Sequence, residues 1–240
     1  MNLLKKPALI FFAFLLTAFS SCSARVDGVV KEGGAAVLTL KTSLAPRTSA
    51  LIRSLKNFMG EGADGPVLDG EAMGRSMAAA PGIGSVSLVN TGPSALEGSI
   101  SISNVGNFLA RGGARSRFIT YNEGRAVGTS SIVIVLDRQS APEIISMLSP
   151  EIEEYLSALM APAVLGEDST KQEYLDLLAS VYGRPLSNEI AEARINAQID
   201  FPRTVTTARG GQAKGKLAEF DIPLVDVLVL ENPLEYEVSW

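Results

Sequence analysis

The chain of 240 residues has no histidine and only one cysteine. The lack of histidine excludes Ser-His-Asp and Cys-His catalytic systems and removes the commonest zinc ligand. A single cysteine excludes a disulfide within the chain, so the fold must rest on its apolar core. We therefore expect a protein without catalytic residues, without a bound metal and without a cofactor.

Aromatic residues are also scarce. They make up 6% of the chain, whereas hydrophobic residues make up 46%, so aliphatic side chains dominate the apolar fraction. Sheets curved around flexible aliphatic side chains commonly enclose hydrophobic space. The same composition also builds a solid core, so it leaves both a ligand cavity and a packed interior open.

Paired carboxylates are the catalytic groups that remain. Asp64 with Asp69, and Glu167 with Asp168, lie close in the sequence and could serve acid–base chemistry or bind calcium. Such pairs are far more often solvated charges in loops. A carboxylate-based hydrolase is therefore kept only as a minor alternative.

The cysteine stands directly after a short apolar segment at the N-terminus. The first six residues end in two lysines, residues 7–19 are mostly apolar, and two serines precede Cys22. An apolar run of about 13 residues is too short to span a bilayer, which takes about 20. This layout resembles a bacterial lipoprotein signal, and Phe19, in place of the commoner Leu, resembles the looser spirochaetal form. An ordinary secretory signal is the alternative.

The resemblance implies a signal peptide over residues 1–21, with cleavage before Cys22 and acylation of that cysteine, for example by palmitate. The acyl chains would then anchor the protein to a bacterial membrane in the cell envelope, on its periplasmic or surface side. Residues 22–34 would form a lipidated tether. Cleavage removes two lysines from a chain whose net charge is already −5, so nucleic acid is a poor partner.

The rest of the chain, residues 35–240, is expected to form one α+β domain. Helical spacing predicts helices after Pro46, over residues 71–80 and within a block at 141–197. Strands are predicted on both sides of that block, at 35–44, 85–88, 96–103, 118–121, 132–136, 199–205, 216–222 and 224–230, with a turn at Gly210-Gly211. This order favours an antiparallel sheet with helices packed on one face and the helical block inserted between strands.

Two apolar stripes within the block are the candidates for ligand contact. Thr170 and Glu173 fit a capping box before the second stripe, and Ser187 is expected to cap a third helix. Packing of these stripes on the sheet is the default interpretation, with a lipid cavity or a membrane surface as the alternatives. The candidate ligand-binding residues are Ile152, Leu156, Leu159, Tyr174, Leu178 and Val181.

A resemblance extends to the C-terminal part of the chain. The stretch Ile199-Asp200-Phe201-Pro202, the Gly210-Gly211 pair, residues 217–223 and the ending Tyr236-Glu237-Val238-Ser239-Trp240 resemble envelope lipoproteins of spirochaetes. They are also distantly similar to LppM-type lipoproteins, whose domain has an α+β, lipid-binding-like character. The helical block has no counterpart in that comparison.

The resemblance implies a lipid-anchored envelope protein that binds a lipid or another apolar ligand. The competing function is a structural or interaction lipoprotein that docks another envelope protein. A closed apolar cavity beneath the helices would favour the first function. A solid core with an exposed apolar patch would favour the second.

Overall fold

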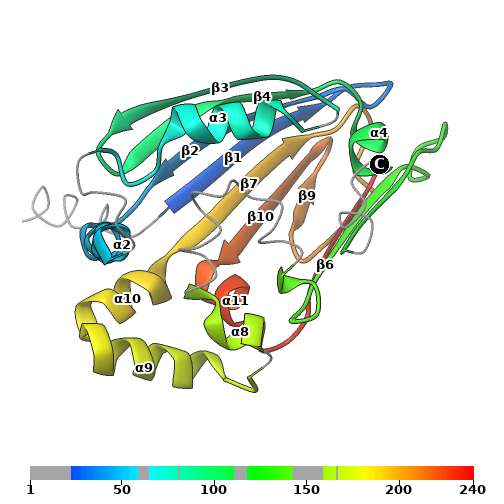
Figure 1. Ribbon diagram of the computed structural model, residues 1–240. Helices are drawn as coiled ribbons and strands as arrows, with labels where there is room; N and C mark the ends of the chain where they lie inside the picture. Colours follow the sequence, from blue (N-terminus) through cyan, green and yellow to red (C-terminus); the bar gives the residue numbers. More distant parts are fainter. Residues whose placement is uncertain (1–22, 59–64, 81, 111–117, 143–158, 166) are drawn as a thin grey trace, which may run out of the picture.

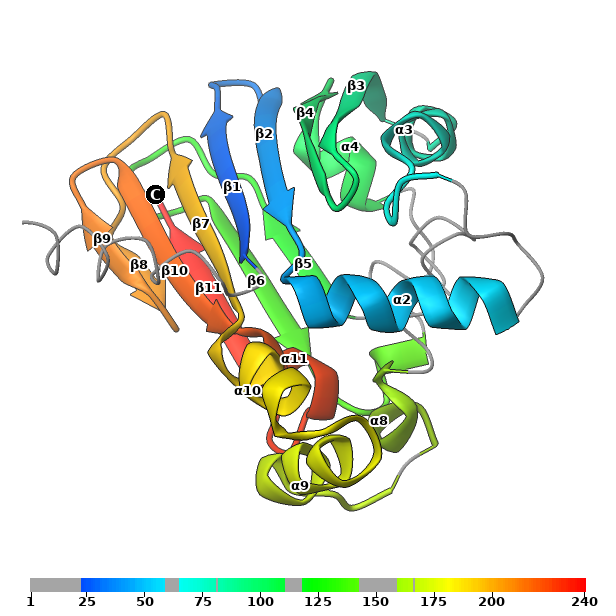
Figure 2. The same ribbon diagram turned by 90° about the vertical axis from the view of Figure 1, so that its left-hand side faces the viewer.

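Two β-sheets lie on either side of an apolar interior, and most helices gather at one end of them (Figures 1 and 2). The computed structural model describes residues 23–58, 65–80, 82–110, 118–142, 159–165 and 167–240. The larger sheet has the strand order β3-β4-β2-β1-β7-β10-β9, and the smaller has the order β5-β6-β11-β8. The α+β class predicted from the sequence is confirmed.

The seven-stranded sheet combines strands from early and late parts of the chain. Its strands β1 and β7 pair in parallel, while all its other neighbours pair antiparallel. In this register Val26 lies between Leu40 and Ala197. The strands are β1 (Ser23–Val30), β2 (Ala36–Ser43), β3 (Ile83–Gly92), β4 (Ala95–Ile102), β7 (Arg194–Asp200), β9 (Gln212–Lys214) and β10 (Leu217–Pro223).

The segment assigned to a tether is therefore part of the sheet. Residues 23–30 form β1, which pairs with β2 on one side and with β7 on the other. Alternate residues of this strand face the interior, and Gly28 and Val30 are buried there. The strand predicted at 199–205 is also displaced, since β7 begins at Arg194 and ends at Asp200.

The four-stranded sheet is antiparallel throughout. Its strands are β5 (Ile119–Asn122), β6 (Ser131–Leu136), β8 (Thr207–Arg209) and β11 (Leu234–Ser239). The predicted turn at Gly210-Gly211 is confirmed, and it connects β8 of this sheet to β9 of the other sheet. Gly210 adopts a φ of +75°, which a residue with a Cβ rarely adopts.

The helices occupy three places. In the ribbon, α3 (Gly70–Ala78) lies along β3, and α4 (Val105–Ala110) follows β4. Helix α2 (Pro46–Phe58) leads away from β2. The helical block lies between β6 and β7 in the chain and packs at one end of the sheets (Figure 1), where it meets α11. That end holds α8 (Ala161–Leu165), α9 (Lys171–Tyr182), α10 (Arg184–Glu192) and α11 (Leu224–Val229).

Local chemistry explains where α9 begins and α10 follows. The predicted capping box is confirmed: the Glu173 amide donates to the Thr170 hydroxyl at 3.2 Å, and the Thr170 amide donates to the Glu173 carboxylate at 2.8 Å. Gly183, with a φ of 89°, ends α9 and directly precedes α10. The predicted cap at Ser187 is wrong, because Ser187 lies inside α10 and donates to the Leu175 carbonyl at 2.8 Å.

The strand predicted at 224–230 is also wrong, because these residues form helix α11. Val225, Leu228 and Val229 are buried, and their spacing of three and four residues places them on one helical face. A short continuous apolar run fits either a covered strand or a buried helix, so the sequence alone did not separate the two. None of the helices in the described part of the chain is long and apolar enough to cross a membrane.

Candidate functional site

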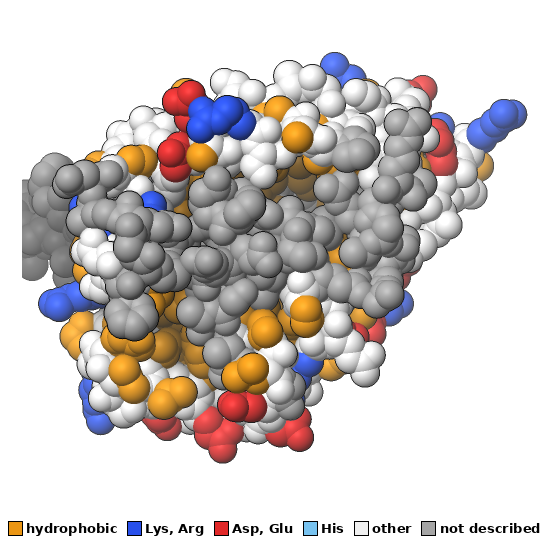
Figure 3. Space-filling model, in the orientation of Figure 1, with side chains coloured by type: hydrophobic (Ala, Val, Ile, Leu, Met, Phe, Trp, Pro, Cys, Tyr) orange, Lys and Arg blue, Asp and Glu red, His pale blue; other side chains and the backbone are white. Residues whose placement is uncertain are grey.

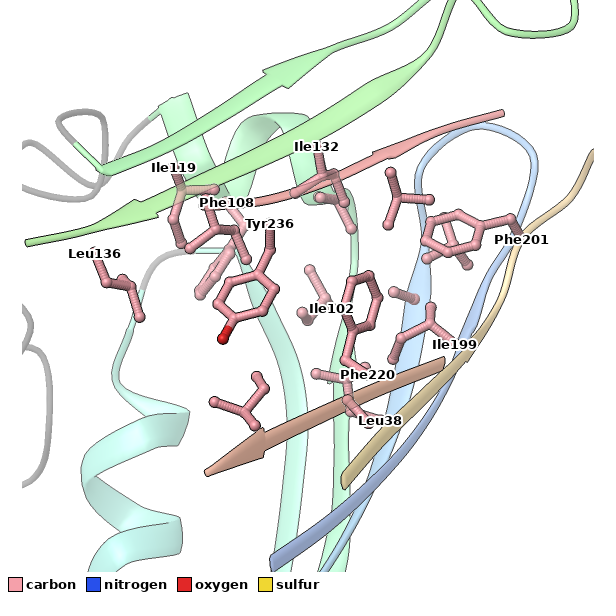
Figure 4. Close-up of a pocket in the computed structure, with 17 residues that line it drawn as sticks. Leu38, Ile102, Phe108, Ile119, Ile132, Leu136, Ile199, Phe201, Phe220 and Tyr236 are labelled. Carbon is pink, nitrogen blue, oxygen red and sulfur yellow. The ribbon is translucent and has the colours of Figure 1, made fainter. Parts of the chain in front are cut away.

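An apolar cavity of about 360 Å³ lies between the two sheets. Figure 4 shows its lining, with side chains from both sheets and from α4 pointing toward one another. Its volume falls within the range of about 300–1,000 Å³ that is typical of small-molecule pockets. The lining residues are Val30, Ala36, Leu38, Ile102, Val105, Phe108, Ile119, Ile132, Ile134, Leu136, Ala197, Ile199, Phe201, Phe220, Ile222, Tyr236 and Val238.

Strand alternation places these side chains in the interior. On β6, every second residue faces the cavity, namely Ile132, Ile134 and Leu136. In the same sheet Ile134 lies opposite Tyr236 of β11. On the facing sheet, Ala197 of β7 lies opposite Phe220 of β10. The cavity is therefore a product of the two sheets.

The chemistry of the lining is almost wholly aliphatic and aromatic. Among the described residues that line the cavity, Tyr236 is the one side chain with a polar atom. A buried water needs two to four polar partners, which these residues do not offer. A charged ligand group would also lack a counter-ion among these residues. The cavity therefore suits the apolar part of a ligand.

The Tyr236 ring is held on two sides. It meets the Phe220 ring edge to face, with the ring centroids 5.8 Å apart and an interplanar angle of 84°. The ring also lies close to Gly210. A Cβ built on Gly210 would lie 2.7 Å from Tyr236 Cδ1, so only glycine leaves room for the ring. Burial raises the pKa of the Tyr236 hydroxyl, and the negative charge of Asp226 raises it further. The hydroxyl is therefore protonated at neutral pH and can donate a hydrogen bond.

The helical residues chosen from the sequence lie elsewhere. Tyr174 is 3% exposed, and its hydroxyl donates to the Leu159 carbonyl at 2.9 Å within a second core formed by α8–α11. Leu178 is buried in the same core, whereas Val181 is 61% exposed. The cavity is lined by none of the four described candidates, namely Leu159, Tyr174, Leu178 and Val181. Ile152, Leu156 and Cys22 lie outside the described residues.

The lining residues that sequence reasoning missed lie on strands that it mostly found. The strands predicted at 118–121 and 216–222 contain Ile119, Phe220 and Ile222, but the sequence analysis did not predict which way these side chains face. The C-terminal strand β11 was not predicted, although Tyr236 and Val238 alternate with Glu235 and Glu237 there. That alternation was the available signal.

Two of the four carboxylates considered for catalysis, Asp69 and Asp168, are in structural positions. Asp69 caps α3, where its side chain accepts a hydrogen bond from the Ala72 amide at 2.9 Å. Asp168 pairs with Arg138 at 2.5 Å, while Glu167 is exposed. Asp64 lies outside the described residues. Within the described ranges, no group of three or more Cys, Asp or Glu residues is placed to hold a metal ion.

A second apolar feature lies on the surface of the helical end. Leu177, Val181 and Tyr182 of α9 are more than half exposed, and Leu165 at the end of α8 is 70% exposed. Figure 3 shows hydrophobic side chains gathered on this lower part of the molecule, among acidic ones. We call these four residues the α8–α9 patch.

Comparison with known proteins adds one neighbour. No protein-family model and no curated protein matches the chain. Among solved structures, the chain is similar to the folded domain of the Mycobacterium tuberculosis LppM protein, determined by NMR. The alignment covers 90% of this chain and 87% of that one, with 11% identity and a TM-score of 0.38. A likeness of this size says nothing about a ligand. The chemistry of a ligand has to be inferred from the cavity itself.

Proposed function

We propose that this is an envelope protein anchored by acyl chains on Cys22, whose domain binds a lipid or another apolar ligand between its sheets. The observation that carries the proposal is the inter-sheet cavity of about 360 Å³, which has no charged residue among the described residues that line it. Each CH₂ group moved from water into such a space contributes about 0.8 kcal/mol. An alkyl chain therefore gains affinity along its length without needing a specific polar partner.

Binding, and not catalysis, is the activity that the lining supports. Apart from the Tyr236 hydroxyl, no side chain among the described lining residues can donate or accept a proton or act as a nucleophile. The raised pKa of Tyr236 disfavours its phenolate form near neutral pH, so its oxygen is a poor base. We therefore propose a carrier or sensor of an apolar molecule.

The proposed anchor has a geometric consequence. Strand β1 begins at Ser23, which is in register with Ser43 on one side and Arg194 on the other. An acyl group on the preceding residue would therefore be attached to the sheet without a tether, and this end of the sheet would be held at the membrane surface. Two acyl chains are sufficient for stable anchoring.

Native mass spectrometry of the chain from Ser23 to Trp240, purified without detergent, tests the binding function. We expect a reproducible additional mass that organic solvent removes as lipid. The substitution Ala197→Phe, which points into the cavity, should reduce this mass. Asn196→Phe, on the exposed face of the same strand, should leave it unchanged. A mass without ligand, combined with no uptake of an added fatty acyl ester, would contradict the proposal.

Docking of another envelope protein is the second candidate function, and the α8–α9 patch is the observation that favours it. Replacing Leu177 and Val181 by serine should then abolish co-purification of a partner from the envelope and leave the bound lipid in place. Loss of the lipid together with the partner would show that the two functions share one surface.

A further inference from the structure

Tyr236 carries a polar group at an otherwise apolar wall, and its hydroxyl lacks a hydrogen-bond partner within the described part of the chain. We infer that the ligand is an alkyl chain that ends in a neutral oxygen acceptor, such as a carboxylic ester, and that the Tyr236 hydroxyl donates a hydrogen bond to it. This inference rests on the proposed function and names the chemical class of its ligand.

Contacts of the Tyr236 ring limit where its hydroxyl can lie before a ligand arrives. The backbone of Tyr236 is paired with Ile134 in the β6–β11 ladder, and its ring lies against Phe220 and the turn at Gly210. Figure 4 shows the ring among the labelled apolar side chains, with the oxygen directed away from β11. A donor that is already oriented loses little conformational freedom when it binds, so its hydrogen bond contributes fully to selectivity.

Tyr236 is half-buried, and its hydroxyl is not among the described buried atoms that lack a partner, so water can reach it in the ligand-free protein. An alkane that displaces this water would leave the hydroxyl without a hydrogen bond, which is unfavourable. A ligand with a carbonyl oxygen near one end of its chain would avoid this cost. The same site therefore discriminates between two ligands of equal apolar surface.

The charges around Tyr236 favour a neutral acceptor over a carboxylate. None of the described lining residues is cationic. The charge that acts on the Tyr236 hydroxyl is the negative one of Asp226, whose carboxylate is itself paired with Lys171 at 2.9 Å. A carboxylate ligand would lose its hydration without gaining a counter-ion, whereas an ester loses much less.

The test compares three ligands with the same number of heavy atoms: a straight-chain alkane, a fatty acid and a fatty acid methyl ester. The chain from Ser23 to Trp240 contains every helix and strand of the described fold. Trp240 is the single tryptophan, and its ring lies 4.5 Å from that of Phe201, which lines the cavity. Its fluorescence therefore reports occupancy. The variants are Tyr236→Phe and, as a matched control, the exposed Tyr182→Phe.

We expect the ester to bind more tightly than the alkane by about two- to twelvefold, the factor that one net hydrogen bond supplies. This difference should vanish in Tyr236→Phe and persist in Tyr182→Phe, and the fatty acid at neutral pH should bind more weakly than the ester. If ester and alkane bind equally in the unmodified protein, or if the fatty acid binds best, the inference is overturned while the proposed function stands. If none of the three ligands binds, the proposed function itself fails.

Discussion

Replacing Ala197 by leucine is expected to stabilise the protein, although the residue lies in the interior. Ala197 borders the cavity from the middle of β7, so the added carbons would enter space that is open in the structure. Three added carbons at about 0.8 kcal/mol each give about 2.4 kcal/mol, and ordering the longer side chain costs about 0.5–1 kcal/mol. The free energy of unfolding should therefore rise by about 1.5 kcal/mol.

Ala218→Leu is the matched control for this change. Ala218 lies on the neighbouring strand β10 and in the same inter-sheet core, but it is 0% exposed and does not line the cavity. The same three carbons should there force neighbouring groups apart and lower the free energy of unfolding by about 1–3 kcal/mol. The two substitutions thus differ in sign only because the cavity lies beside one of them.

Urea unfolding of ligand-free protein, followed by Trp240 fluorescence, measures both variants. Trp240 is buried and packs on Phe201, so its emission changes when the inter-sheet core opens. Equal destabilisation by Ala197→Leu and Ala218→Leu would show that no usable space exists between the sheets. The cavity, and with it the proposed function, would then have to be abandoned.

Four further predictions concern the helical end and the anchor. Thr170→Ala should lower the unfolding free energy by about 1 kcal/mol in urea, through loss of the α9 cap. The capping bonds lower the pKa of Glu173, so its stabilising effect should be present above the unfolded-state pKa and disappear as the pH falls through the folded-state pKa. Unfolding curves at descending pH should therefore converge with those of Glu173→Gln. Tyr174→Phe should cost about 1 kcal/mol of stability without changing lipid content by mass spectrometry, since its hydroxyl bonds to the Leu159 carbonyl. Cys22→Ser should release the domain from sedimented membranes, and a variant that still sediments would contradict the acyl anchor.

Sequence patterns located most of the fold because local signals and burial agree there. The capping box at Thr170 and the turn at Gly210-Gly211 depend on residues adjacent in the chain, so their chemistry is visible in the sequence. The pairing of β1 with β7 joins residues more than 160 positions apart, as in the register of Val26 with Ala197, and no local pattern specifies it. Because this pairing is not visible in the sequence, the tether predicted over residues 22–34 is wrong for residues 23–30, which form β1.

The candidate site was less predictable than the fold. The apolar stripe of α9 predicted a buried face correctly at Tyr174 and Leu178, but periodicity does not say whether a buried face meets a cavity or a packed core. Side chains of the same kinds line both places in this protein. What separates them is the distance between elements, which tertiary structure sets.

That distance follows from how the sheets are connected at their two edges. At one edge, β8 and β9 belong to different sheets but are joined by only the two residues Gly210-Gly211, so the sheets must approach there (Figure 2). Toward the other edge α4 enters the interior, and its Val105 and Phe108 line the cavity. The sheets therefore diverge from a tight edge toward one wedged open by a helix. Strand β6 lies between β5 and β11, yet none of its six residues is fully buried. A central apolar strand that stays half-buried is what the divergence requires, because its inward side chains face space that none of the described residues fills.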